Sequence, residues 1–144
     1  MHLSEICFSF VDVSFDFVSE EKVKKWISNS LLSEGRNIGL LTYVFCNDYY
    51  LQKINAKYLK TSNLTDVIAF AYDEHEGVCG DVFISTERVE ENAKSFNKSS
   101  INEMSRVMLH GALHLIGYND KTKAEKQEMT RIEDKYLSLH PLFK

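Results

Sequence analysis

The chain has 144 residues, a length that predicts a single domain spanning 1–144. Hydrophobic residues make up 44% and charged residues 26%, which excludes a disordered chain, a collagen-like chain and a bare coiled coil. Seventeen Lys and Arg stand against 21 Asp and Glu, for a net charge of −4. Because proteins that bind nucleic acid by bulk charge are basic, any RNA or DNA partner must meet a local patch.

The predicted elements alternate between strands and helices along the chain. In order, they are a strand over 6–12, a helix over 20–34, a strand over 38–46, a helix over 48–59, strands over 66–72 and 81–85, and helices over 86–96, 100–116 and 122–140. An acidic turn over 73–77 separates the last two strands, which indicates a hairpin or a strand near a sheet edge. This pattern predicts an α+β fold, with a single mixed sheet of about four strands flanked by five helices.

The cysteines and the apolar runs predict the compartment. Cys7, Cys46 and Cys79 are odd in number, widely spaced and without a CxxC pair, so we expect reduced thiols rather than a disulfide framework. The first ten residues lack the basic start of a secretory signal. Since no apolar run approaches the about 20 residues that a membrane-spanning helix needs, we expect a cytoplasmic protein without membrane association.

The segment 110–120 carries the most specific chemical pattern. His110 and His114 are four residues apart on a predicted helix, so they lie about 40° apart around its axis and one turn above each other. Gly117 can adopt the positive φ that ends the helix and reverses the chain, which lets Asp120 return as a third ligand. Two imidazoles and a carboxylate, with a fourth position for water, describe a catalytic zinc site.

The same histidine spacing occurs in metzincin peptidases, with one chemical difference. In their H-E-x-x-H motif, the residue after the first histidine is the Glu that activates water. Here that position is Gly111, which has no side chain to accept or donate a proton. The pattern therefore predicts the metal geometry and disfavours a peptidase.

Segment 110–120, HGALHLIGYND, resembles the H-G-x-L-H-L-x-G-Y-x-H/D signature of the YbeY family of bacterial single-strand-specific endoribonucleases and rRNA maturation factors. Two upstream segments are similar to further family motifs. Residues 80–85 resemble a G-D-I-x-I-S strand, and 51–70 resembles L-N-x-x-Y-R…P-T-D-V-L-S-F through Asn55, Tyr58, Thr65, Asp66, Val67 and Phe70. The resemblance covers about 37–120. It implies a mixed sheet flanked by helices, zinc in the cleft and action on ribosomal RNA precursors.

The chain departs from the family pattern at two positions. Asp120 stands where the family usually has a third histidine, and an Asp oxygen is a legitimate zinc ligand. Leu59 stands where an Arg usually follows the Tyr, and that Arg is a candidate phosphate contact. Lys60 is adjacent, and Arg106 lies one helical turn before His110, so either could supply the missing charge. We take Arg106 as the substitute phosphate contact.

Asp66 is a further candidate beside the predicted cleft. It lies at the start of a strand, where the family motif places residues near the site. Its carboxylate either orients a ligand histidine or caps a turn. The sequence leaves both interpretations open.

These observations predict a single-domain enzyme with one zinc ion bound by His110, His114 and Asp120. The resemblance implies a metal-dependent hydrolase that cleaves single-stranded RNA, in rRNA maturation and ribosome quality control with the small ribosomal subunit. One alternative is a non-catalytic, zinc-containing ribosome assembly factor, favoured by Leu59 and the acidic balance. A metallopeptidase is the other alternative, and Gly111 argues against it.

Overall fold

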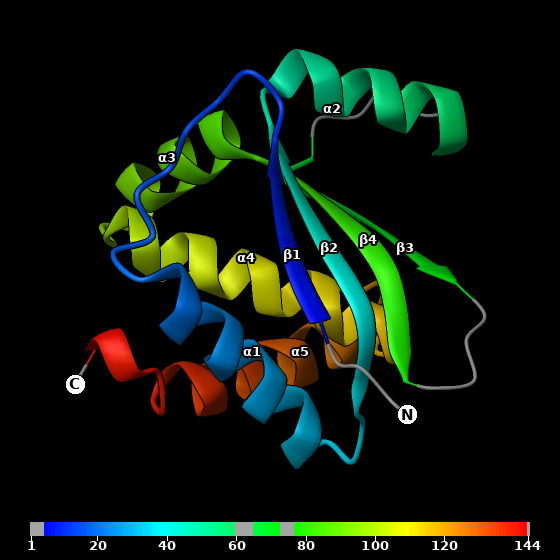
Figure 1. The fold of residues 1–144 in the computed structure, drawn as a ribbon, viewed down its shortest axis with the longest axis vertical. Coiled ribbons are helices and arrows are strands. Elements are labelled where there is room, and N and C mark those ends of the chain that lie inside the picture. Colours follow the sequence, from blue (N-terminus) through cyan, green and yellow to red (C-terminus); the bar gives the residue numbers. More distant parts are fainter. Residues whose placement is uncertain (1–4, 60–64, 73–76, 144) are drawn as a thin grey trace.

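The computed structural model describes residues 5–59, 65–72 and 77–143. The described strands are β1 (Glu5–Phe10), β2 (Ile38–Cys46), β3 (Val67–Tyr72) and β4 (Val78–Ser85). The helices are α1 (Glu20–Ser33), α2 (Asp48–Ile54), α3 (Thr86–Ser95), α4 (Ser100–Leu115) and α5 (Lys123–Leu137), with a π-helical turn η1 (Asn55–Leu59) and a 3-10 turn η2 (Pro141–Phe143). Figure 1 shows these elements as one sheet with helices around it, which confirms the predicted α+β class.

The four strands form one mixed sheet in the order β1-β2-β4-β3. β1 pairs with β2, and β2 with β4, in parallel, whereas β3 pairs antiparallel with β4. The prediction of a hairpin or edge strand around the acidic turn is confirmed, since β3 lies at the edge of the sheet beside its sequence neighbour β4.

Most element boundaries agree with the predictions to within three residues. The helix predicted over 48–59 is α-helical only to Ile54 and continues as the π-helical turn η1, and β4 also begins earlier than predicted. The predicted start at residue 81 was wrong, because pairing already begins at Val78. Gly80 belongs to the strand, and a Cβ there would come within 2.5 Å of the Phe70 carbonyl oxygen on β3. The glycine therefore reflects a close backbone approach inside the sheet rather than the end of the turn.

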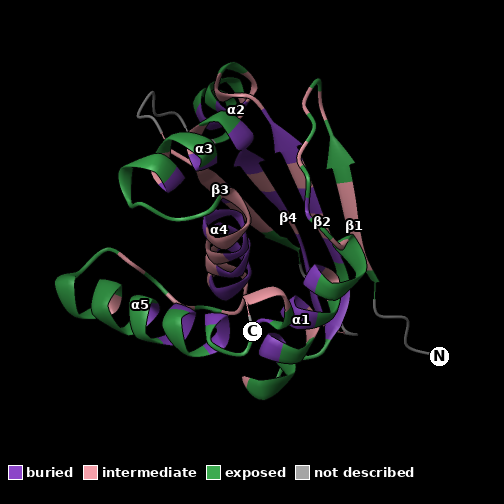
Figure 2. Ribbon diagram, turned by 90° about the vertical axis from the view of Figure 1, so that its left-hand side faces the viewer, coloured by how far each residue is buried: buried purple, intermediate pink, exposed green. Residues whose placement is uncertain are grey.

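The two faces of the sheet are covered unequally. Helix α4 packs on one face against β3 and β4, and α1, α3 and α5 pack around it. Figure 2 shows α4 between the sheet and helices α1 and α5, and many of its residues are buried. Helix α2 contributes to a smaller cluster on the other face, around Cys46, Leu51 and Ile68. The large core therefore lies on the face that carries α4.

Gly111 allows α4 to lie close to the sheet. A Cβ at this position would come within 2.5 Å of Val82 Cγ1 on β4 and 3.3 Å of Val67 Cγ2 on β3. The residue after the first histidine therefore faces packed valines, and a longer side chain there would need the helix to move away. This close packing fixes the distance between helix α4 and strand β3.

Two further sequence expectations concern the thiols and the membrane. The three cysteines are free, with Cys46 and Cys79 buried and Cys7 partly buried. Within the described ranges, the helices are too short or too polar to cross a bilayer.

Candidate metal centre

Helix α4 carries both candidate histidine ligands in its last two turns. Ser99 caps the helix by accepting from the Asn102 backbone N–H, and apolar residues such as Met104, Met108 and Leu109 bury the other sides. His110 and His114 are partly exposed, with 23% and 29% of their side-chain surface accessible. The helix is thus anchored by its core residues while two imidazoles one turn apart reach the surface.

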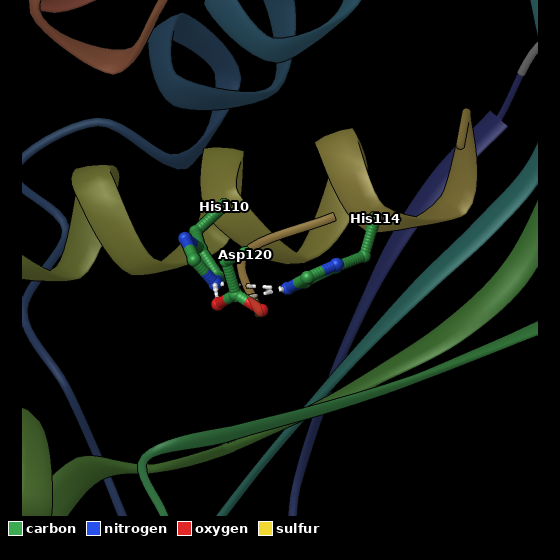
Figure 3. Close-up of side chains that lie close together, drawn as sticks. All are labelled: His110, His114 and Asp120. Carbon is green, nitrogen blue, oxygen red and sulfur yellow. Dashed lines mark hydrogen bonds and ion pairs between the residues drawn. The ribbon is translucent and has the colours of Figure 1, made fainter. Parts of the chain in front are cut away.

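The end of α4 brings the third residue back to the histidines. Gly117 has φ of +106°, as predicted, and the Tyr118 N–H donates to the Leu113 carbonyl at 3.1 Å while the Gly117 N–H donates to the His114 carbonyl at 3.1 Å. This pair of bonds is the Schellman motif, which satisfies the last helical carbonyls and reverses the chain. Asp120 follows three residues later and lies against the two rings (Figure 3).

The three side chains converge on one point (Figure 3). His110 Nε2 and His114 Nε2 lie 3.0 Å apart. Asp120 Oδ2 lies 3.1 Å from the first nitrogen and 3.5 Å from the second. Three ligands at the corners of a tetrahedron around zinc, with bonds of about 2.0–2.1 Å, would be about 3.3 Å apart. The observed triangle matches that spacing.

The hydrogen bonds made by the Nδ1 atoms of the two histidines determine which ring nitrogens carry lone pairs. His110 Nδ1 lies 2.7 Å from Glu133 Oε2, and His114 Nδ1 lies 2.9 Å from the Tyr118 carbonyl oxygen. An ionised carboxylate and a carbonyl can only accept, so both Nδ1 atoms are donors. In neutral rings both Nε2 atoms then bear lone pairs, and these point at each other and at a carboxylate oxygen. These converging lone pairs could bind a cation at their centre.

Negative charge surrounds the candidate site. Burial lowers the pKa of His110, but the hydrogen bond and charge of Glu133, with Asp120 and Asp66, raise it above its ordinary value overall. Burial raises the pKa of Asp66, and burial with the nearby Asp66 charge raises that of Glu103 to about 7. A group of carboxylates around two imidazoles favours a divalent cation there.

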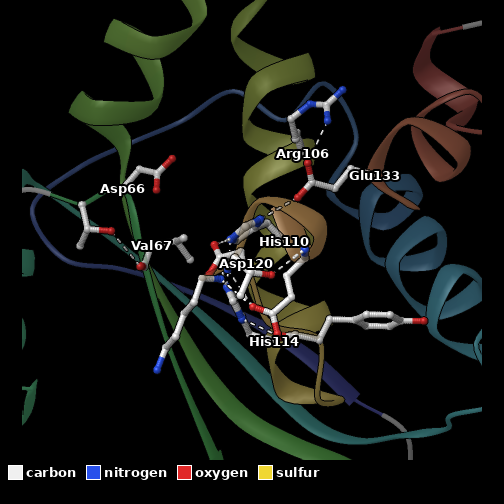
Figure 4. A network of polar contacts seen from close by, with 12 residues as sticks. Asp66, Val67, Arg106, His110, His114, Asp120 and Glu133 are labelled. Carbon is white, nitrogen blue, oxygen red and sulfur yellow. Dashed lines mark hydrogen bonds and ion pairs between the residues drawn. The ribbon is translucent and has the colours of Figure 1, made fainter. Parts of the chain in front are cut away.

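Glu133 is a site residue that the sequence interpretation missed. It lies on α5, its side chain is 6% exposed, and it contacts both His110 and Arg106 (Figure 4). Helix α5 is rich in charged residues, yet Met129, Ile132 and Tyr136 form a buried stripe that includes Glu133. A carboxylate within an apolar stripe is the signal that could have identified it.

The predicted phosphate contacts have different outcomes. Arg106 lies on α4 beside Glu133 (Figure 4). It pairs with Glu133 Oε1 at 2.8 Å and with Asp134 Oδ1 at 2.5 Å, and 28% of its side chain is exposed. Lys60 lies outside the described residues, and of Leu59 the structure describes only the backbone, in η1.

Asp66 lies across from α4 at the start of β3, and its Oδ2 accepts from Asn92 Nδ2 at 3.3 Å.

Comparisons with known proteins identify the family. The family model described as "Endoribonuclease YbeY" matches residues 11–140, more than the 37–120 that the motifs cover. The chain belongs to the YbeY family. Membership confirms the prediction of an enzyme of the endoribonuclease class, a hydrolytic nuclease.

Individual YbeY relatives support the assignment over nearly the whole chain. Endoribonuclease YbeY of Flavobacterium johnsoniae is 42% identical over 128 residues, covering 89% of this chain and 92% of the relative. The Christiangramia forsetii protein of the same name is 41% identical over 139 residues, covering 96% of each. The solution structure of TM1509 from Thermotoga maritima is similar with a TM-score of 0.65 at 25% identity, covering 93% of this chain and 87% of that one.

Proposed function

We propose that this YbeY-family protein is a zinc-dependent endoribonuclease that cleaves single-stranded RNA, with one zinc ion held by His110, His114 and Asp120. Its substrate is a ribosomal RNA precursor on the small ribosomal subunit, and its role lies in rRNA maturation and ribosome quality control in the cytoplasm. The family match and the named relatives support the nuclease activity. The acidic net charge of −4 is consistent with recognition through a local patch rather than through bulk charge.

The convergence of three candidate ligand atoms at 3.0–3.5 Å carries this proposal. His110, His114 and Asp120 would hold the ion, which would supply Lewis acidity for negative charge on a phosphoryl oxygen. The chain's own residues hold the geometry. Tyr118 and Glu133 keep the Nδ1 protons in place, and Asp120 contributes the carboxylate. The 37% exposed Asp120 side chain leaves the site open to a ligand from solvent.

Two routes of cleavage are compatible with this arrangement. Attack by water leaves a free 3′-hydroxyl end, whereas attack by the RNA's own 2′-hydroxyl leaves a 2′,3′-cyclic phosphate. In either route the attacking oxygen must lose a proton to an acceptor. Analysis of the product ends separates the routes.

The proposal is tested by incubating the zinc-loaded protein with a single-stranded RNA and with the same RNA annealed to its complement. We expect cleavage of the single strand, slower cleavage of the duplex and no cleavage of a peptide or casein substrate. Equal loss of both RNAs would contradict single-strand specificity. RNA binding without any cleavage would instead favour the assembly-factor alternative.

Arg106 is proposed to contact an RNA phosphate beside the metal. Its guanidinium already bonds Glu133 and Asp134, and the 28% exposed side chain can also meet a phosphate. We expect Arg106→Ala to weaken RNA binding by about 10–100-fold, since a charge-assisted hydrogen bond contributes about 1.5–3 kcal/mol. Filter binding over a salt series should also show a shallower salt dependence, by about one phosphate contact. Unchanged RNA affinity in a variant that keeps its zinc would contradict the contact.

A further inference from the structure

The Glu133 carboxylate lies between two α4 side chains and bonds both. Its Oε2 accepts from His110 Nδ1 at 2.7 Å, and its Oε1 accepts from Arg106 Nη1 at 2.8 Å. We propose that Glu133 is a positioning residue, which holds His110 in the tautomer and orientation that present Nε2 to the metal. This inference rests on the proposed zinc site, and it adds a residue from α5 to a site otherwise built from α4 and the turn after it.

The tautomer of His110 is contested by two carboxylates. Asp120 Oδ2 lies 3.1 Å from Nε2, close enough to accept a proton from that nitrogen. If the proton moved to Nε2, that nitrogen would donate a hydrogen bond to the Asp120 oxygen. Neither atom would then have its lone pair free for the metal. Glu133 competes at the other side of the ring and keeps the proton on Nδ1. Its bond therefore leaves two ligand atoms available to the metal.

Glu133 is itself held in a defined position. Its side chain is 6% exposed, and the neighbouring residues Ile132 and Tyr136 are buried in the core. Arg106 bonds the second carboxylate oxygen (Figure 4) and also pairs with Asp134, so two neighbouring α5 carboxylates share one α4 guanidinium. A carboxylate held at both oxygens can orient a ring more strictly than a mobile surface carboxylate can.

The two histidines are oriented by different parts of the fold. His114 Nδ1 donates to the Tyr118 carbonyl, within the same turn that ends α4. His110 Nδ1 depends on a side chain 23 residues later on another helix. Loss of the Glu133 carboxylate should therefore affect His110 and leave His114 unchanged, which provides a reference within the same molecule.

The test compares Glu133→Met, which removes the acceptor at similar length, with Asp134→Asn as the matched control. Asp134→Asn weakens the other Arg106 ion pair without touching the bond to His110. Zinc affinity is measured by competition with a chromophoric chelator, and the tautomers of both rings by ¹⁵N NMR of the metal-free proteins. We expect Glu133→Met to bind zinc about 10–100-fold more weakly, and its His110 to shift toward the Nε2-protonated form. The control should keep wild-type zinc affinity and tautomers, and His114 should stay unchanged throughout.

Wild-type zinc affinity in folded Glu133→Met, or equal weakening in Asp134→Asn, would overturn the proposal. So would a metal-free wild-type protein in which His110 carries its proton on Nε2, a result that needs no variant to fold. A wild-type protein that binds no zinc would instead refute the proposed metal site. The NMR measurement therefore separates failure of the positioning role from failure of the site.

Discussion

We expect removal of the metal to lower the rate of RNA cleavage by about a thousandfold, since Lewis-acid stabilisation of transition-state charge is worth several kcal/mol and each 1.36 kcal/mol is tenfold. The protein is stripped with a chelator, dialysed and assayed on single-stranded RNA before and after addition of one equivalent of zinc. Because the fold has a continuous core under α4, the stripped protein should remain folded by circular dichroism.

The control for the chelation experiment is to add metal back and to measure whether RNA cleavage returns. Zinc should restore cleavage in the wild type, and magnesium should not, because two of the three candidate ligands are imidazole nitrogens and magnesium prefers oxygen. Cleavage that persists at the full rate after chelation, in protein shown to hold no metal, would contradict a metal-dependent mechanism.

The second large effect is expected at His114. His114→Ala leaves two of the three candidate ligands, so zinc affinity should fall by more than about 100-fold, beyond the loss typical of an outer hydrogen-bond partner. Cleavage at limiting zinc should fall in parallel. The matched control is His140→Ala, a histidine buried beside Ser105 and Trp26, outside the candidate site.

The two histidine variants separate metal loss from loss of stability. His140→Ala removes a fully buried ring and should lower the melting temperature while zinc stoichiometry stays at the wild-type level. His114→Ala removes a partly exposed ring, so it should lower zinc binding while the melting temperature of the metal-free protein stays near the wild-type value. Equal zinc affinity in His114→Ala and the wild type would refute the assignment of this residue as a ligand.

Local rules were sufficient to predict that the three candidate metal ligands meet. The spacing of His110 and His114 follows from helical geometry, and the return of Asp120 follows from the positive φ of Gly117. All of these residues lie within one helix and its terminating turn. The strand and helix types were predictable for the same reason, because periodicity and capping are written in neighbouring residues.

Features that depend on distant parts of the chain were not predictable. Glu133 reaches His110 only because α5 docks on α4, and the partners of Arg106 lie on α5 for the same reason. The sheet order places β4 between β2 and β3, which requires pairing between strands about 40 residues apart. Single-sequence patterns carry no signal for such contacts, so neither the strand order nor the role of Glu133 could be predicted.

The central claim is that His110, His114 and Asp120 hold one zinc ion, and elemental mass spectrometry of protein purified without added metal tests it most directly. We expect about one zinc per chain in the wild type, much less in Asp120→Ala, and retention in Asp120→His, which restores the ligand usual in the resembled motif. No zinc in the wild type, even after zinc is offered and the excess is washed away, would contradict the account and leave the two histidines as polar residues at the end of α4.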